Sequence, residues 1–219
     1  MFRVVCLLIG YAFGCVQTAY LLGKFVYRID IRTEGSGNAG TTNITRVLGA
    51  KAGAVVFLTD VLKAVAAYVL CSLFFHGSGS FVPDVSVLGG VDLPQAGYLP
   101  GLYAGVGVII GHNFPFYMKF KGGKGIASTV GVTLSFDWLG GLIGGLIGLL
   151  GVLTTKYISV TSLTLTALFP IIMLIRGHRG ETVVLGFVVM ALAWFQHRGN
   201  IVRLLKGTEN KFTIGKRTK

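Results

Sequence analysis

Long apolar runs alternate with shorter polar segments along the whole chain. The runs lie near residues 4–23, 53–75, 98–112, 126–154, 158–175 and 181–196. About 20 apolar residues in a helix span the hydrocarbon core of a bilayer, so these runs predict transmembrane helices. The pattern therefore predicts an all-α, polytopic integral membrane protein, built as a single domain over residues 1–219.

The run over residues 126–154 is longer than one span requires. Asp137 and Trp138 interrupt it, and Gly140 and Gly141 follow directly. Two short helices over this run would give seven transmembrane helices in total. A five-span arrangement, in which two of the later runs do not cross independently, also fits the pattern.

Glycines recur at four-residue spacing in the same run. Gly140, Gly144 and Gly148 form one series, and Gly141 and Gly145 form a second. Small residues at this spacing let helix backbones approach closely. We expect this face to pack against another helix of the same chain, and a dimerisation face is the alternative.

Composition excludes the ordinary soluble classes. Hydrophobic residues make up 53% of the 219 positions and charged residues only 13%, against about 25% in a typical soluble domain. The mean hydropathy is +0.72. So few charged side chains cannot cover a water-facing surface of ordinary size, which excludes a soluble enzyme and a disordered chain. The cysteines Cys6, Cys15 and Cys71 lie inside apolar runs without metal-type spacing, so we expect small buried hydrophobes.

The charge distribution predicts the orientation in the membrane. The chain carries 20 Lys and Arg against 8 Asp and Glu, a formal net charge of +12. Such an excess can indicate nucleic acid in a soluble protein, but in a membrane protein basic residues collect in cytoplasmic loops. The polar segment 76–97 has no basic residue, whereas basic residues gather in segments 28–51, 113–125 and 197–219. We therefore expect no nucleic-acid partner, an outside N-terminus, an external 76–97 segment and a cytoplasmic C-terminus.

The first basic segment contains a loop, residues 35–46, that mixes glycines with small hydrogen-bonding side chains. Five of its side chains could hold a ligand: Ser36, Asn38, Thr41, Asn43 and Arg46. Glycines let the backbone bend close to a ligand, consecutive N–H groups can cradle an anion, and a guanidinium matches the geometry of a phosphate. The loop predicts binding of a phosphate or a polyol.

The second segment, residues 111–125, runs from His112 past Lys119 into a glycine-rich turn before an apolar helix. The turn reads Gly122-Gly123-Lys124-Gly125. A lysine at a helix N-terminus favours anions, because the first N–H groups are unpaired and the helix dipole is positive there. A nucleotide P-loop is excluded, since its first glycine would fall on Met118 and its Ser or Thr on Gly125. His112 is expected either to support the turn or to bind the ligand.

The third segment, residues 197–209, places three polar side chains three residues apart. His197, Asn200 and Arg203 would share one face of a helix. Such a group could orient or deprotonate a hydroxyl and hold a phosphate. The alternative is a basic tail that only meets anionic lipid.

Two ionisable residues, Asp60 and Lys63, lie inside the second apolar run. Their three-residue spacing lets them pair on one helix face. Charged side chains within a span are costly unless they are paired or functional. A structural ion pair and a role at the site are both consistent with this position.

Three anion-binding segments on one membrane face indicate a phosphorylated substrate that meets a lipid. A transporter or flippase for a phosphorylated metabolite is the competing class, but it predicts polar groups spread through the spans and an internal repeat. An assembly factor that binds anionic lipid would not need Ser36, Asn38 or Asn200.

The three segments resemble the motifs of the bacterial acyl-phosphate-dependent glycerol-3-phosphate acyltransferases, the PlsY family. They read SGNAGTTNITR from Ser36, GHNFP followed by FKGGKG, and HRGNIVRLLKGTE from His197. All three occur in the family's order, and the resemblance covers essentially the whole chain. Ala39 stands where the family often has Pro and Thr41 where it often has Ala, and neither change removes a donor or a charge.

This resemblance implies a seven-span fold in the bacterial cytoplasmic (inner) membrane, with the site facing the cytoplasm. It implies transfer of a fatty acyl group from acyl phosphate to the sn-1 hydroxyl of glycerol 3-phosphate, giving 1-acyl-glycerol 3-phosphate and phosphate. No cofactor and no metal is expected, because a mixed anhydride is already activated. The expected partners are these two substrates and the bilayer. A monomeric state and functional coupling to an enzyme that produces acyl phosphate would fit this reaction.

The family motifs also imply roles for individual residues. Ser36 and Arg46 would contact glycerol 3-phosphate, and His197 and Asn200 would position its glycerol. The turn Gly122–Gly125 would hold the phosphoryl group of the acyl phosphate. The remaining expected binding residues are Asn38, Thr41, Asn43, His112, Lys119, Arg203 and Glu209. His197 is the candidate general base, since its ordinary pKa lies near 6.5, and a phosphate oxygen of a substrate is the alternative proton acceptor.

Overall fold

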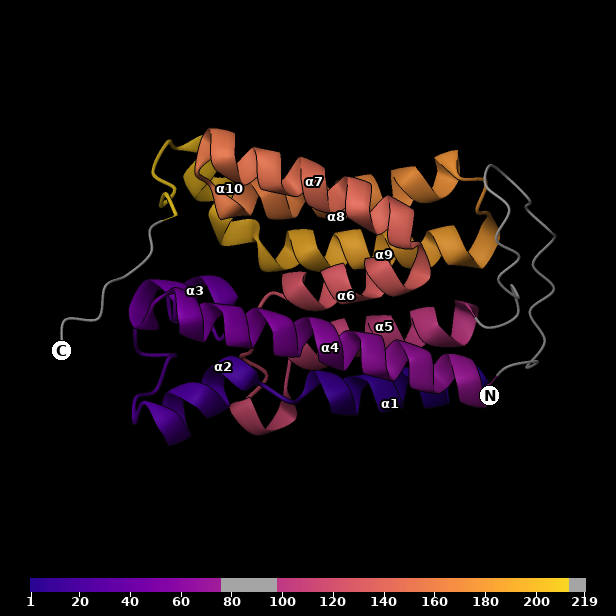
Figure 1. Cartoon of the computed structure of the whole chain (residues 1–219), viewed down its shortest axis with the longest axis horizontal. Coiled ribbons are helices and arrows are strands. Elements are labelled where there is room, and N and C mark those ends of the chain that lie inside the picture. The colour runs from indigo at the N-terminus through magenta and orange to yellow at the C-terminus, as the bar shows by residue number, and fades with distance from the viewer. Residues whose placement is uncertain (76–97, 213–219) are drawn as a thin grey trace.

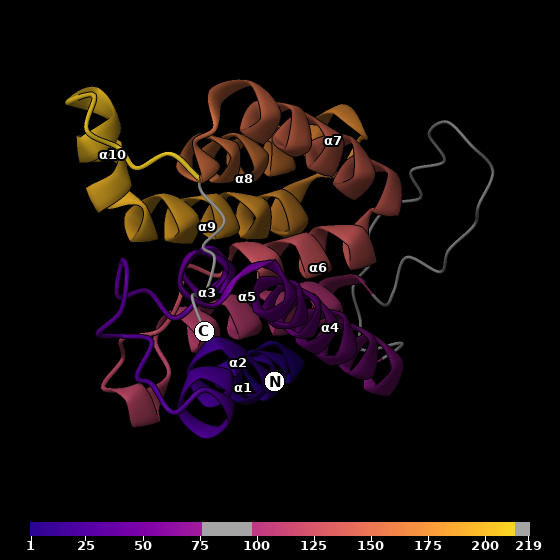
Figure 2. The same ribbon diagram turned by 60° about the vertical axis from the view of Figure 1, so that its left-hand side comes forward.

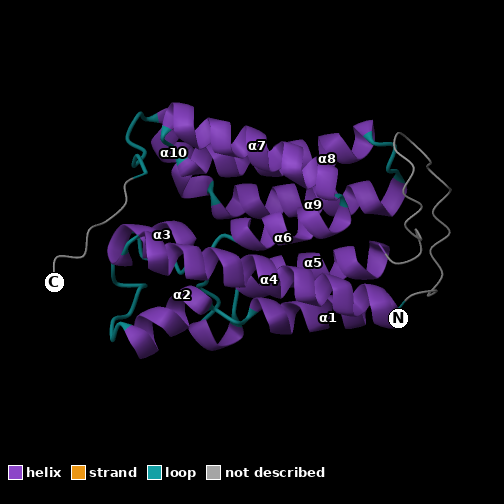
Figure 3. Ribbon diagram, viewed as in Figure 1, coloured by secondary structure: helices purple, strands orange, loops and turns teal. Residues whose placement is uncertain are grey.

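The structure is a computed structural model, and it describes residues 1–75 and 98–212. Every regular element in these ranges is a helix (Figure 3), which confirms the all-α prediction. The elements are α1 (Phe2–Gly14), α2 (Thr18–Leu21), η1 (Leu22–Val26), α3 (Thr41–Leu48), α4 (Ala50–Phe74), α5 (Tyr98–Asn113), η3 (Phe116–Met118), α6 (Ile126–Phe136), α7 (Trp138–Thr155), α8 (Ile158–Ile175), α9 (Gly180–Gln196) and α10 (Arg198–Leu205). The segment 76–97, expected to be external, lies outside the described residues.

The long helices lie side by side along the longest axis of the molecule (Figure 1). In both views α1, α4 and α5 form one group, α7, α8 and α9 form another, and α6 lies between them (Figure 2). Helix α5 is buried along most of its length. Gly10 and Gly14 of α1 meet the backbone of α5 at Ala104 and Val108 with no room for a Cβ atom. Such close backbone contact is typical of helices in membranes.

The long run over residues 126–154 folds as two helices, which is one of the two arrangements that the sequence left open. Helix α6 ends at Phe136 and α7 begins at Trp138. Asp137 separates them, and its side chain accepts a hydrogen bond from the N–H group of Gly140 at 3.0 Å. This bond satisfies one of the unpaired N–H groups at the start of α7, so Asp137 is its N-cap.

Four of the described helices are long and apolar enough to cross a bilayer. They are the nearly continuous helix Phe2–Val26, α4, α7 and α8, and the bent pair of α9 and α10 would be a fifth. Helix α6 is apolar but shorter. The sevenfold crossing and the orientation of the termini stay predictions.

The glycine series of α7 packs within the chain. A Cβ atom on Gly140, Gly144 or Gly148 would lie about 3 Å from side chains of α8, namely Ile172, Leu165 and Thr161. The expectation of intramolecular packing is confirmed for this series. The outer face of α7 instead exposes large apolar side chains such as Leu146, Leu149, Leu150 and Leu153, which suit contact with lipid. Cys6, Cys15 and Cys71 are buried and free, as expected.

Candidate active site

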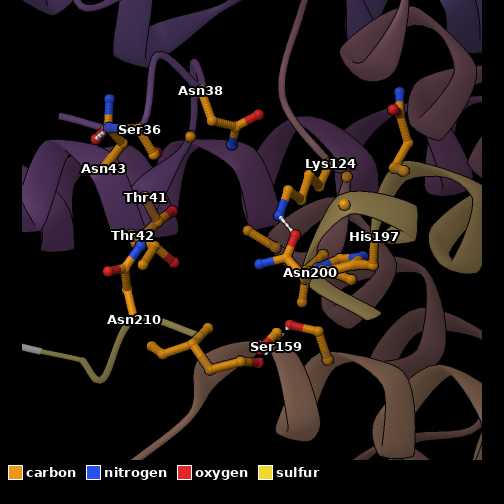
Figure 4. Close-up of a pocket in the computed structure, with 18 of the residues that line it drawn as sticks. Ser36, Asn38, Thr41, Thr42, Asn43, Lys124, Ser159, His197, Asn200 and Asn210 are labelled. Carbon is orange, nitrogen blue, oxygen red and sulfur yellow. Dashed lines mark hydrogen bonds between the residues drawn. The ribbon is translucent and has the colours of Figure 1, made fainter. Parts of the chain in front are cut away.

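A cavity of about 710 Å³ opens at the end of the bundle where α3 and α10 lie. All three polar segments singled out in the sequence contribute to its wall. Figure 4 shows Ser36, Asn38, Thr41 and Thr42 on one side and Lys124, Asn200 and His197 on the other. Twelve of the predicted site residues line it: Ser36, Asn38, Thr41, Asn43, Arg46, His112, Lys124, Gly125, His197, Asn200, Arg203 and Glu209.

One wall is a loop held in shape by a buried amide. Asn43 accepts a hydrogen bond from the N–H group of Ser36 at 2.8 Å and donates to the carbonyl oxygens of Ile31 and Glu34 at 3.2 and 2.9 Å. Gly35 has φ +57°, and a Cβ atom there would clash with the Asn43 amide. Asn43 therefore organises the loop that presents Ser36 to the cavity. Within the described residues, the guanidinium of Arg46 has no hydrogen-bond or ion-pair partner and is left for a ligand.

The facing wall is a chain of polar side chains. Lys124 donates a hydrogen bond to Asn200 Oδ1, and Asn200 Nδ2 donates to Glu209 Oε1 at 2.6 Å. Glu209 also pairs with Arg203 at 2.7 Å and accepts a hydrogen bond from Ser159 at 3.0 Å. The carboxylate thus ties the start of α8 to α10. Its contacts hold Asn200 and Arg203 in place at the cavity, so Glu209, expected as a binding residue, has the geometry of a positioning residue.

Burial and neighbouring cations change the acidity of Lys124. Desolvation lowers its pKa to about 8, with further lowering by the charges of Arg203 and Arg46, while Glu209 acts in the opposite direction. An ammonium group depleted of water and close to two guanidinium groups favours a bound anion. Lys124 therefore meets the electrostatic requirement for a phosphoryl-binding residue.

His197 stands at the bend between α9 and α10, whose axes differ by 63°. It is 3% exposed. Its Nδ1 lies 2.7 Å from the carbonyl oxygen of Ala193. A carbonyl can only accept, so Nδ1 carries the hydrogen and Nε2 of the neutral ring is the acceptor. The ring is therefore held in the tautomer that a general base requires.

Asp60, Lys63 and His112 meet beside the cavity. Lys63 and Asp60 form an ion pair at 2.7 Å, which confirms the predicted pairing along α4. Lys63 Nζ also lies 3.0 Å from His112 Nδ1. Both Asp60 and His112 line the cavity, so the pair also borders the site.

The glycine-rich turn is only partly in the cavity wall. The N–H groups of Gly122 and Gly123 donate to the carbonyl oxygens of Asn113 and His112 at 3.1 and 3.0 Å, so neither is free to bind a phosphate. Lys119 is exposed after η3 and does not line the cavity. The predicted phosphoryl site is thereby narrowed to Lys124, Gly125 and the start of α6.

Four helices begin at the cavity wall. The first residues of α3, α6, α8 and α10 all line it. None of these four starts has a side-chain cap or an acidic residue in its first turn. The first N–H groups of a helix lack intrahelical partners and carry the positive end of its dipole. Helix α10 follows α9 after a single residue, and a backbone N–H group at this junction donates to the carbonyl oxygen of Phe195, so α3, α6 and α8 have the open termini. Three such termini around one cavity favour an anionic ligand with more than one phosphate or carboxylate group.

The family follows from the match along the chain. A family model described as "Glycerol-3-phosphate acyltransferase" matches residues 4–207. The chain belongs to the glycerol-3-phosphate acyltransferase family. The resemblance stated from the three motifs is thus confirmed.

Relatives of this acyltransferase family match over nearly the full length. A glycerol-3-phosphate acyltransferase of Thermoanaerobacter pseudethanolicus is 40% identical, covering 100% of this chain and 98% of its own. That of Lactiplantibacillus plantarum is 37% identical, covering 97% and 93%. The crystal structure of PlsY (YgiH), an integral membrane glycerol 3-phosphate acyltransferase, in its glycerol 3-phosphate form matches with a TM-score of 0.82 and 29% identity over 96% of both chains. Its lysophosphatidic acid form matches with a TM-score of 0.79. The protein is an integral membrane protein of this type.

Sequence reasoning missed several polar residues of the acyltransferase cavity. Thr42, Ser159, Ser162 and Asn210 all line it. Ser159 and Ser162 lie in a run read only as an apolar span, yet their three-residue spacing puts both hydroxyls on one face of α8. That spacing was the available signal. In the described part of the chain, no cluster of three or more His, Cys, Asp or Glu residues is close enough to hold a metal ion.

Proposed function

We propose that the protein transfers a fatty acyl group from acyl phosphate to the sn-1 hydroxyl of glycerol 3-phosphate. The hydroxyl oxygen forms an ester bond to the acyl carbon, the bond from that carbon to the phosphate oxygen breaks, and inorganic phosphate leaves. The observation that carries this proposal is one cavity lined by two cations, Arg46 and Lys124. Arg46 belongs to α3, and the first residues of α3, Thr41 and Thr42, lie across the cavity from Lys124 (Figure 4). Two phosphorylated substrates can thus be held side by side for reaction.

The two walls have different substrates in this proposal. Arg46 and Ser36, with the uncapped start of α3, bind the phosphate of glycerol 3-phosphate. Lys124, Gly125 and the start of α6 bind the phosphoryl group of the acyl phosphate and stabilise it as it leaves. Family membership and the glycerol 3-phosphate named for the solved PlsY structure support the first assignment.

Asn200 and His197 act at the reacting hydroxyl. Asn200 is fixed by Lys124 and Glu209 and can orient the glycerol. Nε2 of His197 is a free acceptor for the proton, and a phosphate oxygen of either substrate is the competing acceptor. A His197→Gln variant that keeps most activity would assign the proton to the phosphate.

We also propose seven crossings of the bacterial cytoplasmic membrane, with the N-terminus outside and the cavity facing the cytoplasm. The three basic segments meet at one end of the bundle, which is the end that the positive-inside rule assigns to the cytoplasm. A single chain contains both cavity walls, which supports a monomer. An enzyme that produces acyl phosphate would supply the donor.

The test is phosphate release by the purified protein in detergent or lipid, given palmitoyl phosphate with and without glycerol 3-phosphate. We expect release that depends on glycerol 3-phosphate, with 1-acyl-glycerol 3-phosphate as product and palmitoyl-CoA inert as donor. Positional analysis of the product checks the sn-1 assignment. Turnover with palmitoyl-CoA but not with palmitoyl phosphate would overturn the donor, and no turnover by folded protein would overturn the reaction.

A further inference from the structure

A buried ionic cluster adjoins the cavity and has no role in the chemistry described above. His112 is 3% exposed, Asp60 1% and Lys63 9%. Lys63 Nζ lies 2.7 Å from Asp60 Oδ1. It also donates to the carbonyl oxygen of Gly14, the last residue of α1, at 3.3 Å and to that of Val16, between α1 and α2, at 2.7 Å. The ammonium is therefore held among three fixed oxygens, with His112 as its fourth neighbour.

The contacts of His112 Nδ1 determine the tautomer of the ring. Lys63 Nζ lies 3.0 Å away and the Asp60 carboxylate 3.6 Å, which is too long for a hydrogen bond. An ammonium has only donors, so Nδ1 must accept and cannot carry a hydrogen. The hydrogen of the neutral ring is therefore on Nε2. A doubly protonated His112 would set two cationic donors 3.0 Å apart.

The Nε2 edge of His112 faces the glycine-rich turn at the cavity. A Cβ atom on Gly123 would clash with Nε2, and Lys124 and Gly125 follow in the cavity wall. Nε2 has no hydrogen-bond partner among residues 1–75 and 98–212. Nε2 is not among the buried side-chain atoms that lack a partner, so its N–H group is open to the cavity, where a ligand oxygen can accept its hydrogen bond.

We propose that Lys63 and Asp60 are positioning residues that hold His112 as a neutral Nε2–H donor, and that this donor binds a phosphoryl oxygen of the acyl phosphate beside Lys124. The inference rests on the proposed function for the identity of the ligand. The tautomer itself rests only on the three side chains. A neutral donor adds a directed hydrogen bond without adding a further charge beside the Lys124 ammonium.

The tautomer can be measured without activity. The four histidines of the chain are labelled with 15N in the imidazole ring, and the His112→Gln variant assigns the His112 signals. The bare and the hydrogen-bearing nitrogen of a neutral imidazole have well-separated 15N shifts. We expect a bare Nδ1 and a hydrogen on Nε2. A hydrogen on Nδ1, or on both nitrogens, near neutral pH would overturn the proposal even if the enzyme turns over.

Kinetics then test the ligand. His112→Leu should raise KM for palmitoyl phosphate about 10- to 100-fold, the range for a hydrogen bond to a charged group, and leave KM for glycerol 3-phosphate nearly unchanged. His112→Gln keeps an N–H donor and should recover most of the affinity. Lys63→Met should shift the hydrogen to Nδ1, toward Asp60, and raise the same KM. Thr59→Val, one residue before Asp60, is the matched control.

The outcomes separate the two proposals. Equal effects of His112→Leu and His112→Gln, or a loss confined to the glycerol 3-phosphate KM, would overturn the donor role. If Lys63→Met does not fold, the proposal is still tested by comparing His112→Leu with His112→Gln and by the 15N spectrum of the wild-type protein. If the wild-type protein shows no turnover with palmitoyl phosphate, the proposed function fails, while the tautomer remains measurable.

Discussion

The two ends of the helix bundle treat charge in opposite ways. At the end opposite the cavity, acidic side chains serve two of the helix starts: Asp137 caps α7 and pairs with Arg176, and Glu181 lies in the first turn of α9 and pairs with Arg3 at 2.6 Å. Helices α1 and α5 begin at the same end without an acidic residue in the first turn. At the cavity end, four helices begin with no acidic residue in the first turn and no side-chain cap.

The contrast shows which end is built for a ligand. An acidic residue at a helix N-terminus satisfies the dipole and the unpaired N–H groups from within the protein. Leaving the starts of α3, α6 and α8 and the Arg46 guanidinium without a partner costs stability unless a bound anion takes that place. In the proposed function, the charges of the first end stabilise the fold and Arg46 and Lys124 at the second end bind substrate.

The largest effect is expected at Arg46. Replacing Arg46 by Ala removes a guanidinium from this wall and should lower kcat/KM for glycerol 3-phosphate by about 100-fold or more. Ser36→Ala and His197→Ala should also abolish most turnover. The measurement is steady-state phosphate release, with gel filtration and thermal unfolding to verify the fold. Near-normal activity in the Arg46 and His197 variants would contradict the site.

Lys124 should give the next largest effect and a pH signature. Its pKa of about 8 lies below the ordinary value of 10.5, so the ammonium of the free enzyme loses its charge as the pH rises through about 8. We expect kcat/KM for acyl phosphate to fall above that pH. Lys124→Arg should remove this decline because a guanidinium stays charged, and Lys124→Met should be weak at every pH.

Linkage distinguishes this decline from unfolding. Between about pH 8 and 10.5 the unfolded chain binds more protons at Lys124 than the folded chain, so this residue makes the free energy of unfolding rise with pH. In this pH range, activity should therefore fall while the contribution of Lys124 to the free energy of unfolding increases. A parallel loss of activity and thermal stability above pH 8 would contradict the assignment.

Much of the fold and site could be predicted because membrane proteins obey strong local rules. The apolar runs, the break at Asp137 and the packing of Gly144 against α8 all follow from helix length, polar interruption and small-residue spacing. The polar loops could be assigned to one site because polar residues are scarce in a membrane-spanning chain and here gather in three segments on one predicted face. The pairing of Asp60 with Lys63 followed from their spacing alone.

The rest depends on three-dimensional contacts that no local pattern contains. The N–H groups of Gly122 and Gly123 donate to carbonyl oxygens at the end of α5 and are therefore not available to a ligand. This pairing depends on how the turn folds against α5, which the sequence pattern does not contain. Ser159 reaches Glu209 because α8 starts beside the chain that follows α10. Asn43 was predicted to bind the ligand, but its side-chain amide forms hydrogen bonds with the backbone of the loop instead.

Glu209→Gln should have a smaller effect than the two cation variants. Although burial opposes it, hydrogen bonds from Asn200, Arg203 and Ser159 hold the pKa of Glu209 below its usual value, so it is ionised at neutral pH. The amide keeps the shape but loses the charge that aligns Asn200 and Arg203. We expect about a tenfold lower kcat, in line with the loss of one charge-assisted contact. Asp30→Asn, which removes an acid paired with Arg32 away from the cavity, is the control.

The smallest effect on activity is expected at the opposite end. Asp137→Ala removes the N-cap of α7 and the partner of Arg176, and should lower the free energy of unfolding by about 1 kcal/mol. Asp137→Ser keeps a capping oxygen and should recover part of that loss. The measurement is unfolding in detergent, followed by kcat/KM at a temperature where both variants are folded.

The Asp137 result decides whether the two ends are independent. If acidic caps serve only the fold, kcat/KM of both Asp137 variants should stay within about twofold of the wild-type value. The cavity is lined by the first residues of α3, α6, α8 and α10, whereas Asp137 lies beyond the last residue of α6. A loss as large as that of Glu209→Gln would mean that the junction of α6 and α7 transmits its geometry to Lys124 through α6. The division between structural and substrate charges would then be wrong.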